Sequence, residues 1–194
     1  MQAFQTLSFW LLGIMILSIV IANMGVLHHI VPYLTDLGYS STTAASLMSL
    51  HMAMLIFGKI VLGGIADRIG LSKSLLIFLI GFVIAVSLLY GASFFWIAIL
   101  FNVLFGLTIS VRTVLPPLMT SACLGEKHFA VIYGFLNIAT TIGTAVGTPL
   151  SGYIYDATKS YNAAFALYMV LGAIAAVAGL VALKQAKWMP ETGQ

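Results

Sequence analysis

Long apolar runs alternate with short polar connections along the whole chain. Six runs stand out, and each approaches or exceeds the roughly 20 residues that a helix needs to cross the hydrocarbon of a bilayer. They cover residues 9–33, 43–64, 74–91, 94–122, 129–154 and 163–183. None shows the period-two alternation of a membrane β-strand. Because backbone groups in lipid must be satisfied within their own segment, the pattern predicts six transmembrane helices.

Composition narrows the class of protein further. Hydrophobic residues make up 61% of the chain, charged residues only 7%, and the mean hydropathy is +1.10. One soluble core cannot hide that much apolar surface, so we expect an all-α membrane protein in which residues 1–194 form a single six-helix bundle. The net charge of +3 is dispersed, with no basic run, so we expect no nucleic-acid partner.

The distribution of positive charge predicts the orientation. With an even number of spans, both ends of the chain lie on the same side of the membrane. That side carries five cations in its loops and C-terminal tail, whereas the opposite side carries only Lys159. The five are Arg68, Lys73, Lys127, Lys184 and Lys187. By the positive-inside rule, both termini are expected in the cytoplasm of a multi-pass protein of the cell membrane.

A charged motif follows the second apolar run. Gly70 permits a tight turn there, and small residues at the end of the run favour close approach of a neighbouring helix. The motif resembles the loop signature G-x-x-x-D-R-x-G-x-x-[RK] of the major facilitator superfamily, and it departs from the fuller pattern at Leu71 and Ser72. The matching residues are Gly63, Asp67, Arg68, Gly70 and Lys73. The resemblance implies that they stabilise a gate and do not touch substrate.

Other segments resemble the same superfamily. The fifth run is similar to its glycine-rich antiporter pattern, with Thr148 inserted before the proline, although glycines also serve plain helix packing. The stretches 28–33 and 153–165 look like the C-terminal half of the monocarboxylate and oxalate/formate branch. This implies a six-helix bundle equivalent to one half of a carrier. The second half is then a separate chain or, in a homodimer, another copy of this one.

Charged and titratable residues inside a span are costly, and they are therefore candidates for the solute pathway. Arg112 has no carboxylate inside any span to pair with, so it binds an anionic substrate, pairs with an acid of the absent half, or snorkels to the headgroups near Glu126. Lys59 either snorkels or lines a vestibule. His51 lines the cavity or is a hydrogen-bonded packing residue.

Polar residues recur along one line of the fifth span. Their azimuths stay within about 40° of a common direction, and such a stripe faces water or another helix but never lipid. The stripe consists of Tyr133, Asn137, Thr141, Thr144, Thr148 and Tyr155. Asn137, Thr141 and Thr144, together with Asn23 of the first span, are the further candidates for substrate binding.

Unopposed positive charge in the spans predicts an anionic solute. With the resemblance, we expect a secondary transporter for small organic anions such as monocarboxylates, working as a symporter or antiporter by alternating access. The sequence contains no Ser–His, Cys–His or paired-carboxylate arrangement at helical spacing, so we expect no enzyme, metal or cofactor. The alternative is a truncated or non-transporting scaffold or sensor derived from a carrier half.

Overall fold

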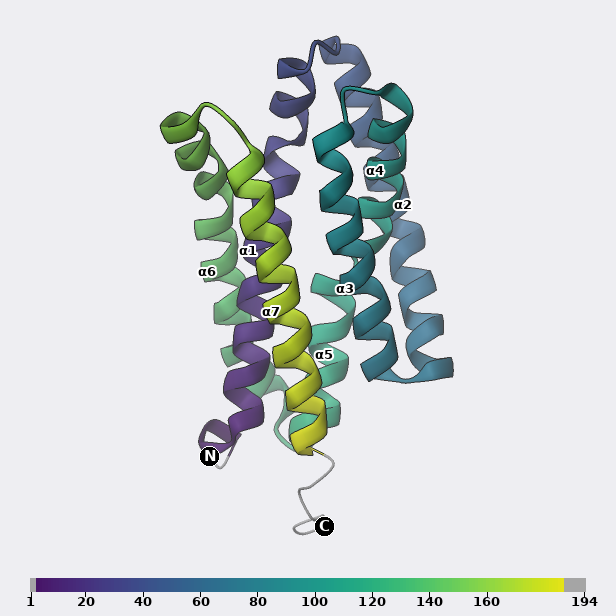
Figure 1. Ribbon diagram of the computed structural model, residues 1–194. Helices are drawn as coiled ribbons and strands as arrows, with labels where there is room; N and C mark the ends of the chain where they lie inside the picture. Colours follow the sequence, from purple (N-terminus) through teal and green to yellow (C-terminus); the bar gives the residue numbers. More distant parts are fainter. Residues whose placement is uncertain (1–2, 187–194) are drawn as a thin grey trace.

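The computed structural model describes residues 3–186, which form a bundle of helices (Figure 1). Six helical stretches in this part of the chain are long and apolar enough to cross a membrane, so the predicted all-α, six-span fold class is confirmed. The helices are α1 (Leu7–Asp36), α2 (Ser41–Ile69), α3 (Leu71–Leu88), α4 (Phe95–Thr108), α5 (Val111–Leu124), α6 (Phe129–Thr158) and α7 (Asn162–Ala186), with short 3₁₀ turns at Ala3–Gln5 and Leu89–Gly91.

Helices α1 and α2 begin two residues before the apolar runs, where polar residues cap them. The Thr6 hydroxyl accepts a hydrogen bond from the Phe9 N–H at the start of α1, and Ser40 accepts one from Thr43 at the start of α2. Between α2 and α3 the connection is Gly70 alone, with φ at 84°, a conformation that glycine adopts without strain. The tight turn predicted at Gly70 is therefore present.

The fourth span is broken, whereas the sequence predicted one continuous run. α4 closes its last α-helical bond from the Ile109 N–H to the Phe105 carbonyl, and α5 begins after Ser110. The Ser110 hydroxyl donates to the Leu107 carbonyl at 2.8 Å. Such local side-chain bonds compete with the helical ladder and bend helices. Pro116 and Pro117 lie further along, inside α5, so the break does not coincide with the prolines.

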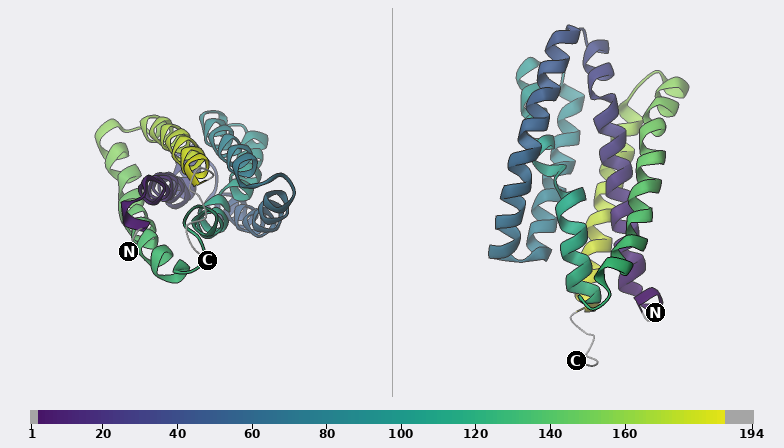
Figure 2. Two further views of the ribbon diagram at one scale, coloured as in Figure 1. Left: turned by 90° about the horizontal axis from the view of Figure 1, so that it is seen from below. Right: turned by 180° about the vertical axis from the view of Figure 1, so that it is seen from behind.

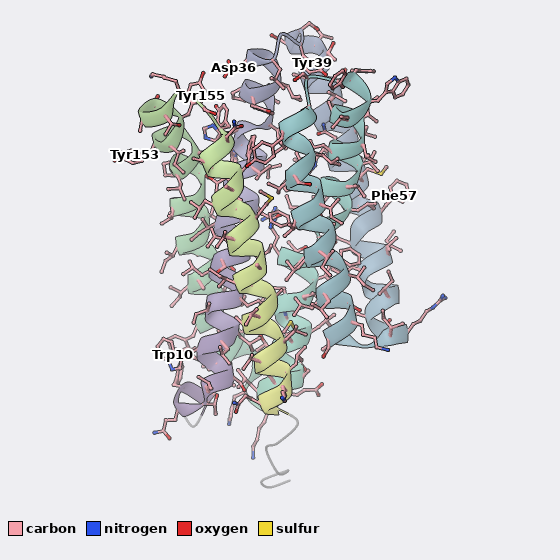
Figure 3. The ribbon with its side chains drawn as sticks, viewed as in Figure 1. Trp10, Asp36, Tyr39, Phe57, Tyr153 and Tyr155 are labelled. Atoms are coloured by element: carbon pink, nitrogen blue, oxygen red, sulfur yellow. The ribbon has the colours of Figure 1, made fainter. Side chains whose placement is uncertain are left out.

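Helix α1 lies at the centre of the bundle. Viewed along the bundle, α1 and α5 lie between α6 on one side and α2 on the other (Figure 2, left). In the apolar windows of the spans, 61% of α1 is buried, against 22% of α2 and 17% of α6. Phe57 of α2 and Tyr153 of α6 accordingly point outward (Figure 3). These two helices therefore present wide faces to lipid or to another protein.

Glycines bring the backbones of neighbouring helices into contact. A Cβ at Gly147 would lie 2.9 Å from the Ile21 Cα, and a Cβ at Gly143 would lie 2.9 Å from Val20. The small-residue step from Gly143 to Gly147 thus packs α6 closely on α1. By contrast, Gly63 and Gly64 have open space around them within the described chain, so the close contact expected at that helix end is not made by residues 3–186.

A buried hydrogen-bonded group ties α1, α6 and α7 together. The Ser151 hydroxyl lies against the Gly25 carbonyl at 2.8 Å and also meets the Tyr168 hydroxyl. Gly25 leaves room for the Tyr168 ring, because any Cβ there would collide with it. Both Ser151 and Tyr168 are almost fully buried. No resemblance or periodicity pointed to this group.

Replacing Ser151 with alanine is expected to destabilise the bundle by about 0.6–2 kcal/mol, because Tyr168 and the Gly25 carbonyl lose a buried partner. Denaturant titration of the protein in lipid nanodiscs measures the effect. Ser87→Ala is the matched control, since that exposed hydroxyl donates only to its own helix at Ile84. Equal stability of the two variants would contradict the role assigned to Ser151.

Both ends of the described chain lie at the same end of the bundle, together with the α2–α3 turn (Figure 1). This is the arrangement expected for an even number of spans. Lys187, one of the cations used to predict the orientation, lies outside the described residues.

Candidate functional site

Several candidate residues lie near the middle of their spans. Asn23, His51, Arg112, Thr141 and Thr144 are each within about four residues, or ~6 Å, of the midpoint of the helical stretch that carries them. In transporters of alternating-access type, solute sites lie near the bilayer midplane. Their depth therefore allows all five to belong to one site. Which of them do so depends on the direction in which each side chain points from its helix.

Asn23 of α1 is fully buried. Its amide nitrogen donates to the Ile19 carbonyl at 2.7 Å, and its Oδ1 has no hydrogen-bond partner within residues 3–186. It lies about 200° around α1 from Gly25, which contacts Tyr168 of α7. Asn23 thus lies on the side of α1 away from Tyr168.

His51 of α2 is fully buried against α4. Its ring centroid is 5.1 Å from that of Phe105. Neither ring nitrogen lies within 3.5 Å of a hydrogen-bond partner in the described part of the chain, although the Asn102 backbone is close enough to act on the ring as a weaker partner. The backbone of Asn102 and the charge of Arg112 are the neighbouring groups that act electrostatically on the ring.

Arg112 occupies the first turn of α5, directly after the break, and is only partly exposed. Its Nε is buried without a hydrogen-bond partner among residues 3–186. The acids of that range lie at helix ends or in a connection, at Asp36, Asp67, Glu126 and Asp156. A guanidinium at this depth therefore lacks an anion within the described chain.

The polar stripe of α6 lies along one flank of the exposed face. Asn137 and Thr141 are exposed, and Thr144 is half-buried. The hydroxyls of Thr141 and Thr144 donate to carbonyls of their own helix, at 3.3 and 2.9 Å. The other flank is apolar and exposed, at Phe135, Ile138, Ile142 and Val146. The α6 surface thus divides into a polar half and an apolar half.

This division predicts different solvent contact for two adjacent positions. In a Cys123→Ser background, Thr141→Cys is expected to react with a charged, membrane-impermeant thiol reagent at least about tenfold faster than Ile142→Cys, because the two lie ~100° apart. Labelling rates in intact membranes measure this. Equal rates, or faster labelling at residue 142, would show that the stripe does not face an aqueous path.

Lys59 and the loop motif lie apart from these mid-depth groups. Lys59 is exposed, and it is rotated about 80° around α2 from the buried His51. Asp67, Arg68 and Lys73 are exposed around the α2–α3 turn. A hollow of about 530 Å³ adjoins that turn, and it is lined by Lys73, by Ala122 of α5 and by Leu183 and Ala186 of α7, among others.

The structure thus separates the candidates into distinct places. The Arg112 charge acts on His51, which packs against α4 of the broken fourth span, whereas Asn137, Thr141 and Thr144 lie along α6. The residues of the loop motif lie together at one end of the bundle, around the α2–α3 turn: Gly63, Asp67, Arg68, Gly70 and Lys73. Asn102, whose buried Oδ1 lacks a partner in the described chain, joins the His51–Arg112 group. Within residues 3–186, no group of three or more His, Cys, Asp or Glu side chains is arranged to hold a metal ion.

His29 has a structural setting of its own. Its Nε2 lies 3.1 Å from the Thr148 carbonyl and its Nδ1 lies 3.3 Å from the Tyr161 hydroxyl, whereas His28 is exposed. Burial and the nearby Asp36 carboxylate raise the pKa of Tyr161, which favours its neutral hydroxyl. His29 thus links α1 to α6 and to the α6–α7 connection. It lies nearer to that end of the bundle than the mid-depth residues do.

Comparison with known proteins agrees with the fold and the motif. Residues 2–191 match the family model of the Major Facilitator Superfamily. Monocarboxylate transporter 12-B of Danio rerio is 30% identical over 146 residues, which cover 72% of this chain and 30% of that protein. Monocarboxylate transporter 14 of Homo sapiens is 31% identical over 127 residues, covering 59% and 24%. The matched region is therefore less than a third of the length of these relatives.

The resemblance inferred from the loop motif is confirmed, and so is a distant similarity to monocarboxylate transporters. Because the family model covers nearly the whole sequence, the chain belongs to the major facilitator superfamily.

Proposed function

We propose that this chain is one half of a secondary membrane transporter that moves small organic anions, such as monocarboxylates, by alternating access. The names of its relatives support this substrate class. The observation that carries the proposal is Arg112, a guanidinium at mid-depth whose Nε is buried and unpaired in the described chain. A guanidinium whose Nε is withdrawn from water without a partner favours an anion, and the carboxylate of a small solute supplies one.

The second half belongs to the same proposal. The polar flank of α6 and the open face of α2 suit a second six-helix bundle, supplied by a separate chain or by another copy. Between the two bundles, Asn23, Lys59, Asn137, Thr141 and Thr144 would line the solute path with Arg112 and His51. The stretches resembling the monocarboxylate branch support placing this chain as the C-terminal half.

Orientation and gating complete the proposal. Both termini and the α2–α3 turn lie on the cytoplasmic side of the cell membrane, and the distribution of cations supports this orientation. Asp67, Arg68 and Lys73 are exposed at that end, where they would contact the second bundle when the cytoplasmic side closes. Gly63, with open space around it, would allow that bundle to approach α2 closely.

Uptake by the native assembly tests the function. The protein is extracted mildly, so that any associated bundle stays with it, and is reconstituted into vesicles. Radiolabelled propionate is expected to accumulate, whereas the neutral isostere propionamide is not. An assembly that moves only neutral or cationic compounds would reject the anion assignment, and one that moves nothing would favour the scaffold alternative.

A further inference from the structure

Helices α3 and α7 pack side by side, and a groove of about 320 Å³ lies between them (Figure 1). Its lining is apolar throughout, with Leu79, Ile80, Val83 and Ile84 from α3 and Gly172, Ala173, Ala176 and Val177 from α7. These positions lie within about three residues, or ~5 Å, of the midpoints of their spans. At that depth an open apolar groove faces the hydrocarbon of the bilayer.

Unequal side-chain size forms the groove. Gly172 lies against α3, where a Cβ would come within 3.0 Å of the Phe82 ring, so the two backbones are close at the floor. Ala173 beside it is small and exposed, whereas Ile80 and Ile84 stand out from α3 with 56% and 49% of their surface exposed. The slot between this ridge and the small residues is open, and an acyl chain there would gain the dispersion contacts that its walls otherwise lack.

A second hollow lies where the same two helices reach the end of the bundle that carries both termini. It is the hollow of about 530 Å³ beside the α2–α3 turn, and Lys73 is the one charged residue among those that line it. Ser72 adds a hydroxyl, and Leu183 and Ala186 of α7 add apolar surface. Lys73 is exposed, and its long side chain can reach a phosphate at the membrane surface.

The two hollows lie on the same faces of their helices. At about 100° per residue, Ser72 and Lys73 lie within about 50° of the mean direction of the groove residues on α3, and Leu183 does so on α7. Leu76 and Leu180, apolar and half-buried, lie between the hollows. From Lys73 to the midpoint of α3 is about eight residues, or ~12 Å, which is close to the ~15 Å of hydrocarbon in one leaflet.

We propose that the α3–α7 groove binds an anionic phospholipid, with its phosphate beside Lys73 and Ser72 and an acyl chain between Ile80 and Ala173. Charge complementarity selects this occupant, because basic pockets between spans on the cytoplasmic side bind anionic headgroups and the cytoplasmic leaflet supplies them. The inference goes beyond the proposed function and uses only its orientation. Since Lys73 is proposed to contact the second bundle when the cytoplasmic side closes, the lipid would hold it in the open state.

Titration of the purified full chain with dioleoyl phosphatidylglycerol and dioleoyl phosphatidylcholine tests the site, because these lipids share their acyl chains and differ in net charge. Native mass spectrometry measures the affinity for the first bound lipid. Wild-type protein is expected to bind the anionic lipid at least about fivefold more tightly, and Lys73→Gln should bring the two affinities to within about twofold of each other. Ala173→Leu, which fills the groove, should weaken the binding of both lipids about threefold to tenfold.

Lys127→Gln and Ala166→Leu are the matched controls. Lys127 is an exposed cation in the α5–α6 connection, and Ala166 is an exposed alanine of α7, two turns from Ala173 and within about 20° of its direction. Both variants should keep the wild-type affinities. If wild-type protein shows no preference for the anionic lipid, or if Lys127→Gln acts as strongly as Lys73→Gln, the headgroup site is wrong. Equal effects of Ala166→Leu and Ala173→Leu would show that no acyl chain occupies the groove.

Discussion

Replacing Arg112 with glutamine is expected to lower propionate uptake by the reconstituted assembly about a hundredfold or more. The glutamine variant leaves the carboxylate of the bound solute without its guanidinium partner. A buried charge that loses its partner costs about 3–5 kcal/mol. Arg112→Lys, which keeps the charge but loses the planar fork of donors, should retain part of the activity. Initial rates of radiolabelled uptake measure both variants.

The control for Arg112 is Lys184→Gln, which removes the same charge from an exposed position in the last turn of α7. That variant should transport at a rate within about twofold of wild type, because exposed charges contribute little. Wild-type uptake by Arg112→Gln would remove Arg112 from the site. It would leave snorkelling toward the headgroups as the explanation of its position.

Replacing Gly58 with alanine is expected to destabilise the bundle by about 1–3 kcal/mol, because the new methyl group would collide with the Leu107 backbone, which cannot rotate away. Gly63→Ala, five residues further along α2, meets open space in the described chain. It should leave stability unchanged or raise it by up to about 1 kcal/mol, since alanine is the better helix former. Denaturant titration in nanodiscs compares the two.

The same pair separates packing within the chain from packing on a second bundle. If Gly63 faces the second half of a carrier, Gly63→Ala should lower uptake while the isolated chain stays as stable as wild type. Equal destabilisation by Gly58→Ala and Gly63→Ala would contradict the packing described for α2. Unchanged uptake by Gly63→Ala would argue against a close contact at that glycine.

The number of spans and their helical structure could be predicted from hydropathy. An apolar run of about 20 residues can cross lipid as a helix, because a helix satisfies its backbone hydrogen bonds within the segment. The Gly70 turn and the Gly143–Gly147 contact were also predictable, since glycine at those spacings has a specific steric use. These features depend on local sequence, so a single chain is enough to find them.

The break at Ser110 and the surroundings of His51 could not be predicted in this way. Serine and threonine back-bond to helices in many spans without breaking them, and the prolines that most strongly disrupt a helix, Pro116 and Pro117, lie inside α5 and not at the break. The partners of His51 and Ser151 depend on which helices pack together, and hydropathy does not specify that. Gly63 shows the converse, because its expected close contact finds no neighbour in the described chain.

Solute movement by single copies tests the central claim most directly. Purified chain is reconstituted at a protein-to-lipid ratio that leaves at most one copy in each vesicle, and radiolabelled propionate is measured both as bound and as accumulated. A chain that forms one wall of the passage is expected to bind the anion without accumulating it. Accumulation by vesicles that hold one copy, at the rate per chain of the native assembly, would contradict the account.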